Sequence, residues 1–167
     1  MDRFAPLVIR LATEQDLPAL EWDGEYRHYR RLFQRAMEEA RRGRRILLLA
    51  EVDDQIVGQI FVQLSTKPAF SFLGMASGYL YAFRVKKPHR GQGIGTQLIA
   101  EAESQLRRQG HARAVISVAK RNVSAMRLYE RLDYRIFSDD PGEWSYVDHL
   151  GRLRKVREPS FVLEKSL

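Results

Sequence analysis

The chain has 167 residues, no cysteine and a formal net charge of +7 at pH 7. Its length suits one hydrophobic core, so we expect a single domain over residues 1–167. The lack of cysteine excludes disulfides, cysteine zinc sites and a thiol nucleophile. The longest aliphatic run, residues 46–50, is too short to span a bilayer, and residues 1–6 lack the apolar stretch of a secretory signal. We therefore expect a cytoplasmic protein that does not enter membranes and whose positive charge attracts polyanions in general.

The elements expected in the N-terminal part follow from apolar periodicity and capping residues. They are a strand at residues 7–11, a helix at 25–43, and a hairpin of strands at 45–52 and 55–64. Thr13, followed three positions later by Asp16, is typical of a capping box, and Pro18 predicts that the helix it opens is short or irregular. Asp53 and Asp54 would make the hairpin turn without the usual glycine.

The rest of the chain alternates between strand and helix patterns. Residues 65–78 contain a proline and two glycines, which predicts a mobile loop. The elements expected after it are strands at 79–85, 112–119 and 134–137, helices at 94–110 and 122–132, a turn at 139–142, and late strands at 144–150, 153–156 and 161–163. This alternation favours an α/β or mixed α+β architecture.

A glycine-rich turn, R-G-Q-G-I-G at residues 90–95, lies between the strand at 79–85 and the following helix. The first N–H groups of a helix have no partner within it, and the helix dipole adds positive potential at the same place. Glycine lets an anion approach the backbone, and Arg90 adds a forked cationic donor. The turn therefore predicts a phosphate or pyrophosphate site.

Two common phosphate-binding motifs fit this turn poorly. A dinucleotide fold requires G-x-G-x-x-G and an acidic residue about twenty positions later, but Thr96 takes the place of the last glycine, and Val115 and Ile116 lie where the acid should be. A P-loop requires Gly-Lys-Ser/Thr, whereas Gly95 is followed by Thr96 and Gln97.

A second motif, N-x-x-A-x-x-L-Y at residues 122–129, follows the turn. Together with V-x-x-P-x-R-G-Q-G-I-G at 85–95, it resembles the GNAT superfamily of acyl-CoA-dependent N-acetyltransferases. The opening at residues 9–17 and the I-V-G of the hairpin at 56–58 are also similar to this family. The resemblance is strongest over residues 79–136 and weaker over most of the remaining chain.

The resemblance implies a mixed α/β fold with a central, mainly antiparallel sheet of six to seven strands, flanked by helices and splayed between the fourth and fifth strands. It also implies acetyl-CoA as the cofactor. The implied cofactor-binding residues are Phe83, Arg84 and Val85 along the pantetheine; Arg90, Gly91, Gln92, Gly93, Ile94, Gly95 and Thr96 around the pyrophosphate; and Asn122 and Tyr129 near the pantetheine and the thioester sulfur.

The implied reaction is direct attack of an amine on the thioester. A backbone N–H near Phe83 would bind the developing oxyanion, and Tyr129 would be the catalytic general acid. Each residue also has a structural interpretation: Tyr129 as core, Asn122 as a helix N-cap, Arg90 as a solvated loop residue. The four histidines lack the spacing of metal ligands, so we expect no metal.

Two departures from the family pattern stand out. The strand before the turn carries no Asp, Glu or His, which leaves the general base open among Glu51, Asp53, Glu143 and an ordered water. Asp133 replaces the usual glycine after the second motif, and aspartate tolerates the left-handed backbone conformation that this position requires.

The expected acceptor is a small-molecule or peptide amine. In this family the early helices and the loop before the glycine turn wall the acceptor site, so the arginines at 25–43 favour an amine that also carries a carboxylate or phosphate. Two alternatives from other classes remain. One is an acyl-CoA sensor that no longer transfers, and the other is a basic nucleic-acid-binding module, disfavoured by the absence of any base-reading motif. The late strands could form a homodimer.

Overall fold

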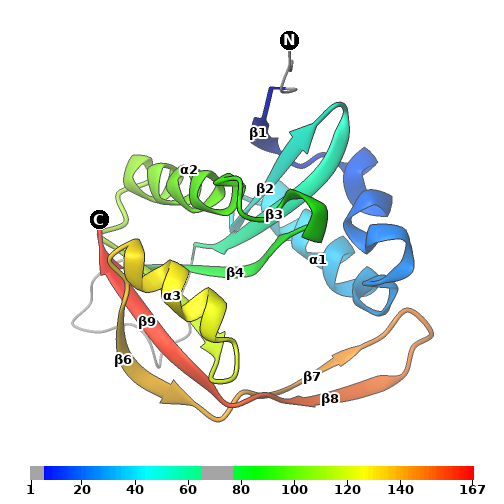
Figure 1. Cartoon of the computed structure of the whole chain (residues 1–167). Coiled ribbons are helices and arrows are strands. Elements are labelled where there is room, and N and C mark those ends of the chain that lie inside the picture. The colour runs from blue at the N-terminus through cyan, green and yellow to red at the C-terminus, as the bar shows by residue number, and fades with distance from the viewer. Residues whose placement is uncertain (1–5, 65–76) are drawn as a thin grey trace.

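The computed structural model describes residues 6–64 and 77–167, and its centre is a seven-stranded sheet with the order β1-β2-β3-β4-β5-β9-β6 (Figure 1). The strands are β1 (Val8–Leu11), β2 (Arg45–Val52), β3 (Gln55–Gln63), β4 (Ser77–Val85), β5 (Arg113–Ala119), β9 (Ser160–Ser166) and β6 (Arg135–Asp140). Within this sheet β4 and β5 are parallel and the other neighbours are antiparallel. The mixed α/β class and the mainly antiparallel sheet are therefore confirmed.

The sheet opens between β4 and β5. These strands pair only from Ser77 with Arg113 to Leu80 with Ile116, although both continue beyond that point. A bulge in β4 accompanies the opening, because the register with β3 slips beyond Phe61 and Ala82 adopts a positive φ of 50°. The splay predicted between the fourth and fifth strands is confirmed.

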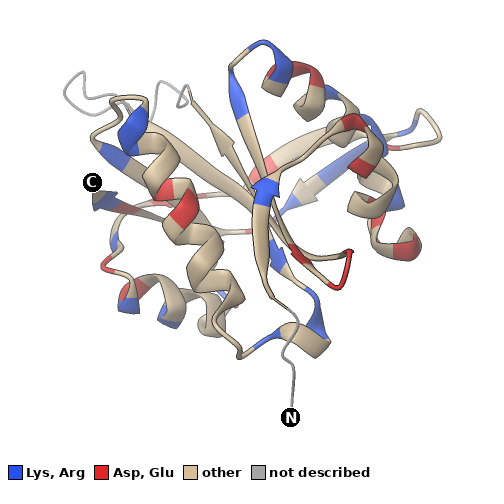
Figure 2. Cartoon of the chain, turned by 90° about the horizontal axis from the view of Figure 1, so that it is seen from above, with Lys and Arg blue, Asp and Glu red and all other residues tan. Residues whose placement is uncertain are grey.

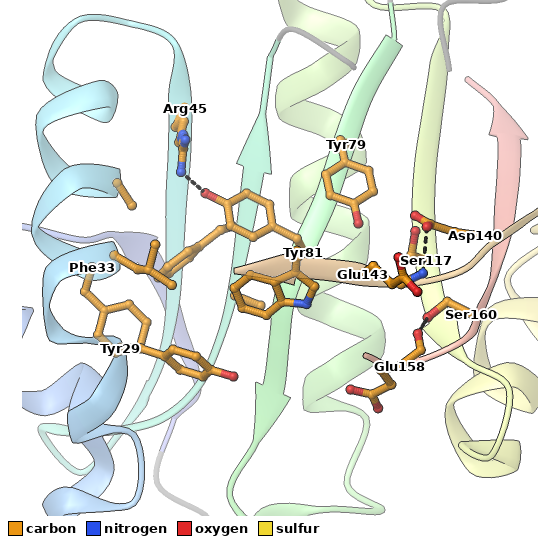
Figure 3. Close-up of a pocket in the computed structure, with 16 residues that line it drawn as sticks. Tyr29, Phe33, Arg45, Tyr79, Tyr81, Ser117, Asp140, Glu143, Glu158 and Ser160 are labelled. Atoms are coloured by element: carbon orange, nitrogen blue, oxygen red, sulfur yellow. Dashed lines mark hydrogen bonds between the residues drawn. The ribbon is translucent and has the colours of Figure 1, made fainter. Parts of the chain in front are cut away.

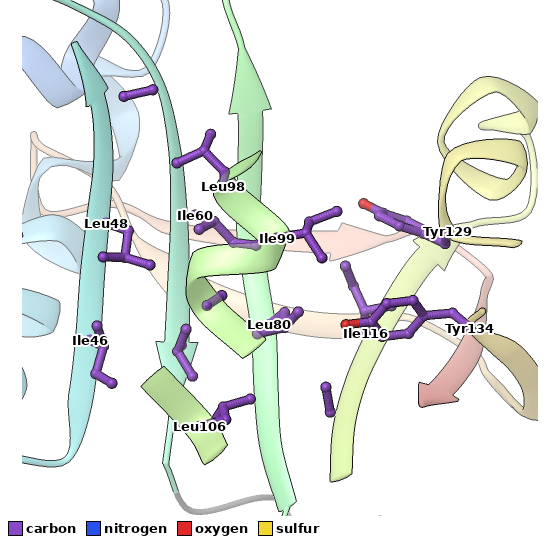
Figure 4. Packing of buried hydrophobic residues seen from close by; sticks show 14 of the residues in the cluster. Ile46, Leu48, Ile60, Leu80, Leu98, Ile99, Leu106, Ile116, Tyr129 and Tyr134 are labelled. Carbon is purple, nitrogen blue, oxygen red and sulfur yellow. The ribbon is translucent and has the colours of Figure 1, made fainter. Parts of the chain in front are cut away.

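One face of the sheet is covered by α2 (Ile94–Arg108) and α3 (Val123–Arg131). The predicted apolar stripe of α2 is confirmed, since Leu98, Ala102 and Leu106 are fully buried against residues such as Leu80 and Ile60 (Figure 4). The other face is covered by α1 (Arg30–Arg41), whose apolar side packs on β2 and β3. The opening between β4 and β5 thus has an α1 side and an α2/α3 side.

The N-terminal helices differ from the prediction in their detail. The segment after Thr13 is a 3-10 helix, η1 (Glu14–Gly24), which is irregular as predicted because Trp22 and Asp23 have positive φ. The helix expected at 25–43 is wrong at its start: a 3-10 turn, η2 (Arg27–Tyr29), precedes α1. Just before η2, the ring centroid of Tyr26 lies 3.5 Å from the Arg84 guanidinium carbon, so a tertiary contact is made where the sequence predicts helix.

The two expected turns with unusual backbone are confirmed. Asp53 and Asp54 both have positive φ, of 50° and 60°, as a two-residue hairpin turn requires. Asp133 has a φ of 72° and supports the left-handed end of α3.

Three expected boundaries are wrong. Of the expected loop at 65–78, Ser77 and Gly78 lie in β4, because the missing Cβ of Gly78 lets Leu106 of α2 pack directly on the strand; the remainder of that prediction lies outside the described residues. The turn expected at 139–142 begins later, since β6 continues to Asp140. The strand expected at 144–150 ends three residues earlier, since β7 spans Glu143–Val147. Among the described residues β7 pairs only with β8 (Leu153–Arg157), and the two form a hairpin that reaches toward the α1 side (Figure 1).

Basic and acidic residues are interspersed along the helices and strands (Figure 2). Several arginines near α1 lie in ion pairs, including Arg30 with Glu21 at 2.8 Å and Arg44 with Glu39 at 3.2 Å. In the part of the chain that the structure describes, no helix is long and apolar enough to cross a bilayer.

The start of the chain offers a test of stability against pH. Arg10 donates to both oxygens of Asp16 at 2.8 Å and holds the pKa of this carboxyl at about 2, below its ordinary 3.8. A lowered native pKa gives stability that is present above the unfolded value and is lost as pH falls through the native one. We expect Asp16→Asn to cost about 1 kcal/mol at neutral pH. In urea unfolding, the deficit should shrink as pH falls toward about 2; a deficit that is constant with pH would contradict this assignment.

Candidate active site

The glycine turn presents free backbone donors. Gly93 is the N-cap of α2 with a φ of 82°, and no side chain caps the helix. Within the described residues, the N–H groups from Gly91 to Thr96 donate no hydrogen bond, and the first N–H that does so is that of Gln97, to the Gly93 carbonyl at 3.1 Å. A Cβ at Gly91 or Gly93 would meet nothing within 4 Å. The turn therefore has the donors and the open space that an anion needs.

The third glycine of the turn and Arg90 have structural roles. A Cβ on Gly95 would lie 2.9 Å from Phe83 Cζ, so this glycine lets the helix start pack against β4. Arg90 Nε donates to the carbonyl of Val85 at 2.8 Å, which ties the turn to the end of β4. The Arg90 side chain is thus partly committed to the fold, while the turn remains exposed to solvent.

Phe83, Gly95 and Tyr129 meet on the α2/α3 side of the opening. The Tyr129 ring lies 6.1 Å from that of Phe83, and the residue is 5% exposed. Its hydroxyl makes no hydrogen bond with the described residues, and burial, with a smaller effect of Tyr79, raises its pKa far above the ordinary value. A buried phenol without a partner is available as a donor to a group that enters the opening.

The bulge of β4 is held by a side chain from the neighbouring strand. Gln59 is fully buried and donates from Nε2 to the Ala82 carbonyl at 3.1 Å. Its Oε1 is buried and has no hydrogen-bond partner among the described residues. Because Ala82 carries the positive φ, this contact fixes the direction of the bulge backbone next to Phe83. Sequence reasoning missed Gln59, because nothing local to β3 indicates a contact with a bulge in β4.

Asn122 adopts its structural role. Its Oδ1 accepts a hydrogen bond from the Ala125 N–H at 3.2 Å and so caps α3. The cap orients the helix that carries Tyr129.

A pocket of about 460 Å³ opens on the α1 side of the same opening, where Ala82 of β4 and Ser117 of β5 both line it (Figure 3). Aromatic rings form one wall, with neighbouring centroids about 5 to 6.5 Å apart, the range of favourable ring contacts. The chain of contacts is Trp144–Tyr29 (6.4 Å), Tyr29–Phe33 (6.1 Å), Phe33–Phe61 (6.1 Å), Phe61–Tyr81 (5.6 Å) and Tyr81–Tyr79 (5.9 Å). Burial raises the pKa of Tyr29, Tyr79 and Tyr81, so the wall stays uncharged.

The opposite side of the pocket is acidic. Asp140, Glu143 and Glu158 line it, and Figure 3 shows them across the pocket from Phe33 and Tyr29. Sequence reasoning named Glu143 but took Asp140 only as part of a turn and missed Glu158. Two other candidate bases are elsewhere: Glu51 is bound to Arg10 at 3.0 Å and Asp53 lies in the hairpin turn, and neither lines the pocket.

The arginines of α1 do not line this pocket. Arg30, Arg31, Arg35 and Arg42 face a separate open groove together with Glu38 and Glu39. The arginine that does line the pocket, Arg45, comes from β2 and donates to the Tyr81 hydroxyl at 2.7 Å. The expectation of an arginine-lined wall from residues 25–43 is therefore wrong at this pocket. The described residues also contain no cluster of three or more His, Asp or Glu that could hold a metal ion.

Comparison with known proteins gives a family match and a common fold. The model of the acetyltransferase (GNAT) family matches residues 10–134. No curated protein sequence matches the chain.

Solved structures resemble the chain over nearly its whole length. The ribosomal-protein-S18-alanine N-acetyltransferase of Escherichia coli superposes with a TM-score of 0.71 at 19% identity, covering 96% of this chain and 94% of that one. Arabidopsis thaliana NAA60 in complex with a bisubstrate analogue gives 0.74 at 18% identity, with 96% and 98% covered. The ribosomal-protein-alanine N-acetyltransferase of Brucella melitensis gives 0.70 at 22% identity, with 96% and 99% covered. At these identities the likeness concerns the fold.

Proposed function

Because the chain belongs to the GNAT acetyltransferase family, we propose that it is an N-acetyltransferase that moves an acetyl group from acetyl-CoA to a primary amine. The observation that carries this proposal is that two dissimilar sites meet at one opening in the sheet. The glycine turn and Tyr129 lie on one side of the opening, and the aromatic and acidic pocket lies on the other. Such an arrangement suits a reaction between two substrates that approach from opposite faces.

The residues present fit acetyl-CoA. The free N–H groups from Gly91 to Thr96 would hold the diphosphate, with Arg90 adding positive charge at the start of the turn. The unpaired edge of β4 beyond Leu80 would accept the pantetheine as an added strand, through the backbone of Phe83, Arg84 and Val85. When bound, acetyl-CoA supplies an activated thioester.

The chain's own groups then act at three places. Backbone N–H groups of the β4 bulge near Phe83 donate to the oxygen on which negative charge develops. Tyr129 holds a proton at its hydroxyl for the departing sulfur. A pocket carboxylate, directly or through water, takes the proton that the amine must lose; the candidates are Asp140, Glu143 and Glu158, which line the pocket.

Gln59 tests the role of the bulge. Gln59→Leu removes the donor to the Ala82 carbonyl and leaves the backbone free to turn. We expect kcat to fall about tenfold or more, with little change in CoA affinity, because misaligned donors weaken only the transition state. Gln59→Glu, which keeps the length of the side chain but not the amide donor, should lower kcat similarly. An unchanged kcat in both variants, with stability reduced, would assign Gln59 a purely structural role.

The proposal is tested by binding and transfer together. CoA and acetyl-CoA should raise the melting temperature in proportion to their occupancy, and thiol release should follow when an acceptor amine is added. Binding without transfer to any amine would favour the acyl-CoA sensor instead. Tight duplex binding that weakens steeply with salt, without stabilisation by CoA, would favour the nucleic-acid module.

A further inference from the structure

The pocket on the α1 side has two chemically different walls. The aromatic wall is continuous from Trp144 on the β7–β8 hairpin to Tyr79 of β4, and it is built from five elements: β7, η2, α1, β3 and β4. Its tyrosines stay protonated because burial raises their pKa. This wall offers a large, uncharged surface for an apolar or aromatic group.

The acidic wall carries most of the charge in the pocket. Glu143 and Glu158 have cationic partners, Arg157 at 3.6 Å and Arg121 at 3.2 Å, but both of these arginines are more than three quarters exposed. Asp140 accepts a hydrogen bond from the Gly142 N–H at 2.8 Å, which holds the carboxylate in place. Among the described residues, the pocket lining therefore includes three carboxylates and one arginine, Arg45, which is already hydrogen-bonded to Tyr81.

These walls select a particular kind of amine. An ammonium group would be attracted by the carboxylates and by the faces of neighbouring rings. A carboxylate attached next to that ammonium would be brought against the acidic wall and repelled. A long polycation without an apolar body would leave the aromatic wall without a partner. A volume of about 460 Å³ has room for a single aromatic group and its amine.

We propose, on the basis of the proposed function, that the acceptor is a primary amine carried on a bulky apolar or aromatic group, with no carboxylate next to the amine. A free arylalkylamine and the α-amine of a peptide that begins with a large apolar residue share this chemistry. Asp140, Glu143 and Glu158 attract the ammonium, and the aromatic wall packs against the attached group.

The test uses acceptors that differ in one feature. 2-Phenylethylamine and phenylalanine differ only in the carboxylate next to the amine, and a peptide beginning with phenylalanine replaces that carboxylate with a neutral amide. We expect kcat/KM for 2-phenylethylamine to exceed that for phenylalanine by at least about tenfold, which corresponds to 1.4 kcal/mol. Spermidine and a peptide beginning with glutamate should be poorer than their apolar counterparts. Whichever of 2-phenylethylamine and the phenylalanine peptide has the higher kcat/KM shows whether the acceptor is a free amine or a peptide.

Two variants link this preference to the pocket. Trp144→Ala removes the outermost ring, and we expect KM for 2-phenylethylamine to rise about fivefold or more while that for ethylamine changes little, because burial of the ring contributes most of its affinity. Leu153→Ala is the matched control, since Leu153 is exposed on the same hairpin and does not line the pocket. Replacing Glu143 and Glu158 together by Gln should narrow the gap between 2-phenylethylamine and phenylalanine.

Binding of the same amines, measured by calorimetry with CoA present, separates this proposal from the reaction itself. Selective binding of 2-phenylethylamine without any acetyl transfer would overturn the enzymatic function and leave the recognition intact. Transfer that favours phenylalanine, glutamate or spermidine over 2-phenylethylamine would overturn the recognition and leave the enzymatic function intact.

Discussion

Gly93→Asp should weaken CoA binding by about a hundredfold or more, a loss of about 2.8 kcal/mol. The N–H groups around Gly93 have no partner in the described residues, and the space next to its Cα is open. A carboxylate placed there would occupy the position of the diphosphate and oppose its charge, and the same helix start that attracts an anion would hold the substituted side chain instead. Calorimetric titration with CoA measures the loss directly.

Gly110→Asp is the matched control for this substitution. Gly110 has a φ of 80°, close to the 82° of Gly93, and its Cβ position is equally open. It lies at the opposite end of α2, so it carries the same backbone strain and the same added charge away from the turn. If the two variants lost CoA affinity equally, the loss would come from general destabilisation and the diphosphate site would have to be placed elsewhere.

Local features of the sequence predict most of the scaffold of the site. The α2 stripe is readable because a helix with one buried face repeats its apolar residues at fixed spacing. The glycine turn is readable because positive φ at Gly91 and Gly93 needs glycine. Asp133 could be assigned a left-handed conformation because it takes the place of the glycine that is usual in the family, and aspartate tolerates this conformation.

The pocket could not be predicted in the same way. Its aromatic wall joins side chains from η2, α1, β3, β4 and β7. Its acidic side comes from the end of β6, the start of β7 and the residue after β8, so neither wall has a local pattern. The wrong expectation that the arginines of α1 line the pocket has the same origin. Their number is visible in the sequence, but the direction they face depends on which side of α1 packs on Leu49 and Phe61.

The contact made by Gln59 and the first residue of α1 could not be predicted from the sequence either. The contact of Gln59 with Ala82 exists only because β3 and β4 pair with a bulge at that point. The 3-10 turn before α1 starts directly after Tyr26, whose ring contacts the Arg84 guanidinium, a contact between residues 58 positions apart. In both cases a tertiary contact overrides the local preference of the chain.

Tyr129→Phe should lower kcat by about 10²- to 10⁴-fold while CoA affinity and KM for the amine stay nearly constant. The phenol is buried next to Phe83 and lacks a hydrogen-bond partner in the described residues, so its removal costs the fold little.

The pH dependence of the native protein's rate provides a second test of Tyr129. Burial raises the pKa of Tyr129 well above its ordinary value, so the phenol stays protonated across the range in which an amine acceptor loses its proton. The rate of the native protein should therefore rise as the amine deprotonates, without an alkaline fall caused by Tyr129.

Tyr134→Phe is the control for this prediction, because Tyr134 is equally buried in the same core but donates to Glu103 at 2.9 Å. Its loss leaves Glu103 with Lys165 as its remaining partner in the described part of the chain, so we expect reduced stability with kcat nearly unchanged. Stopped-flow measurement of thiol release, with CoA affinity measured in parallel, distinguishes the two variants. A Tyr129→Phe protein with native kcat would remove this residue from the chemistry. Tyr129 would then be a core residue only, and water would protonate the departing sulfur.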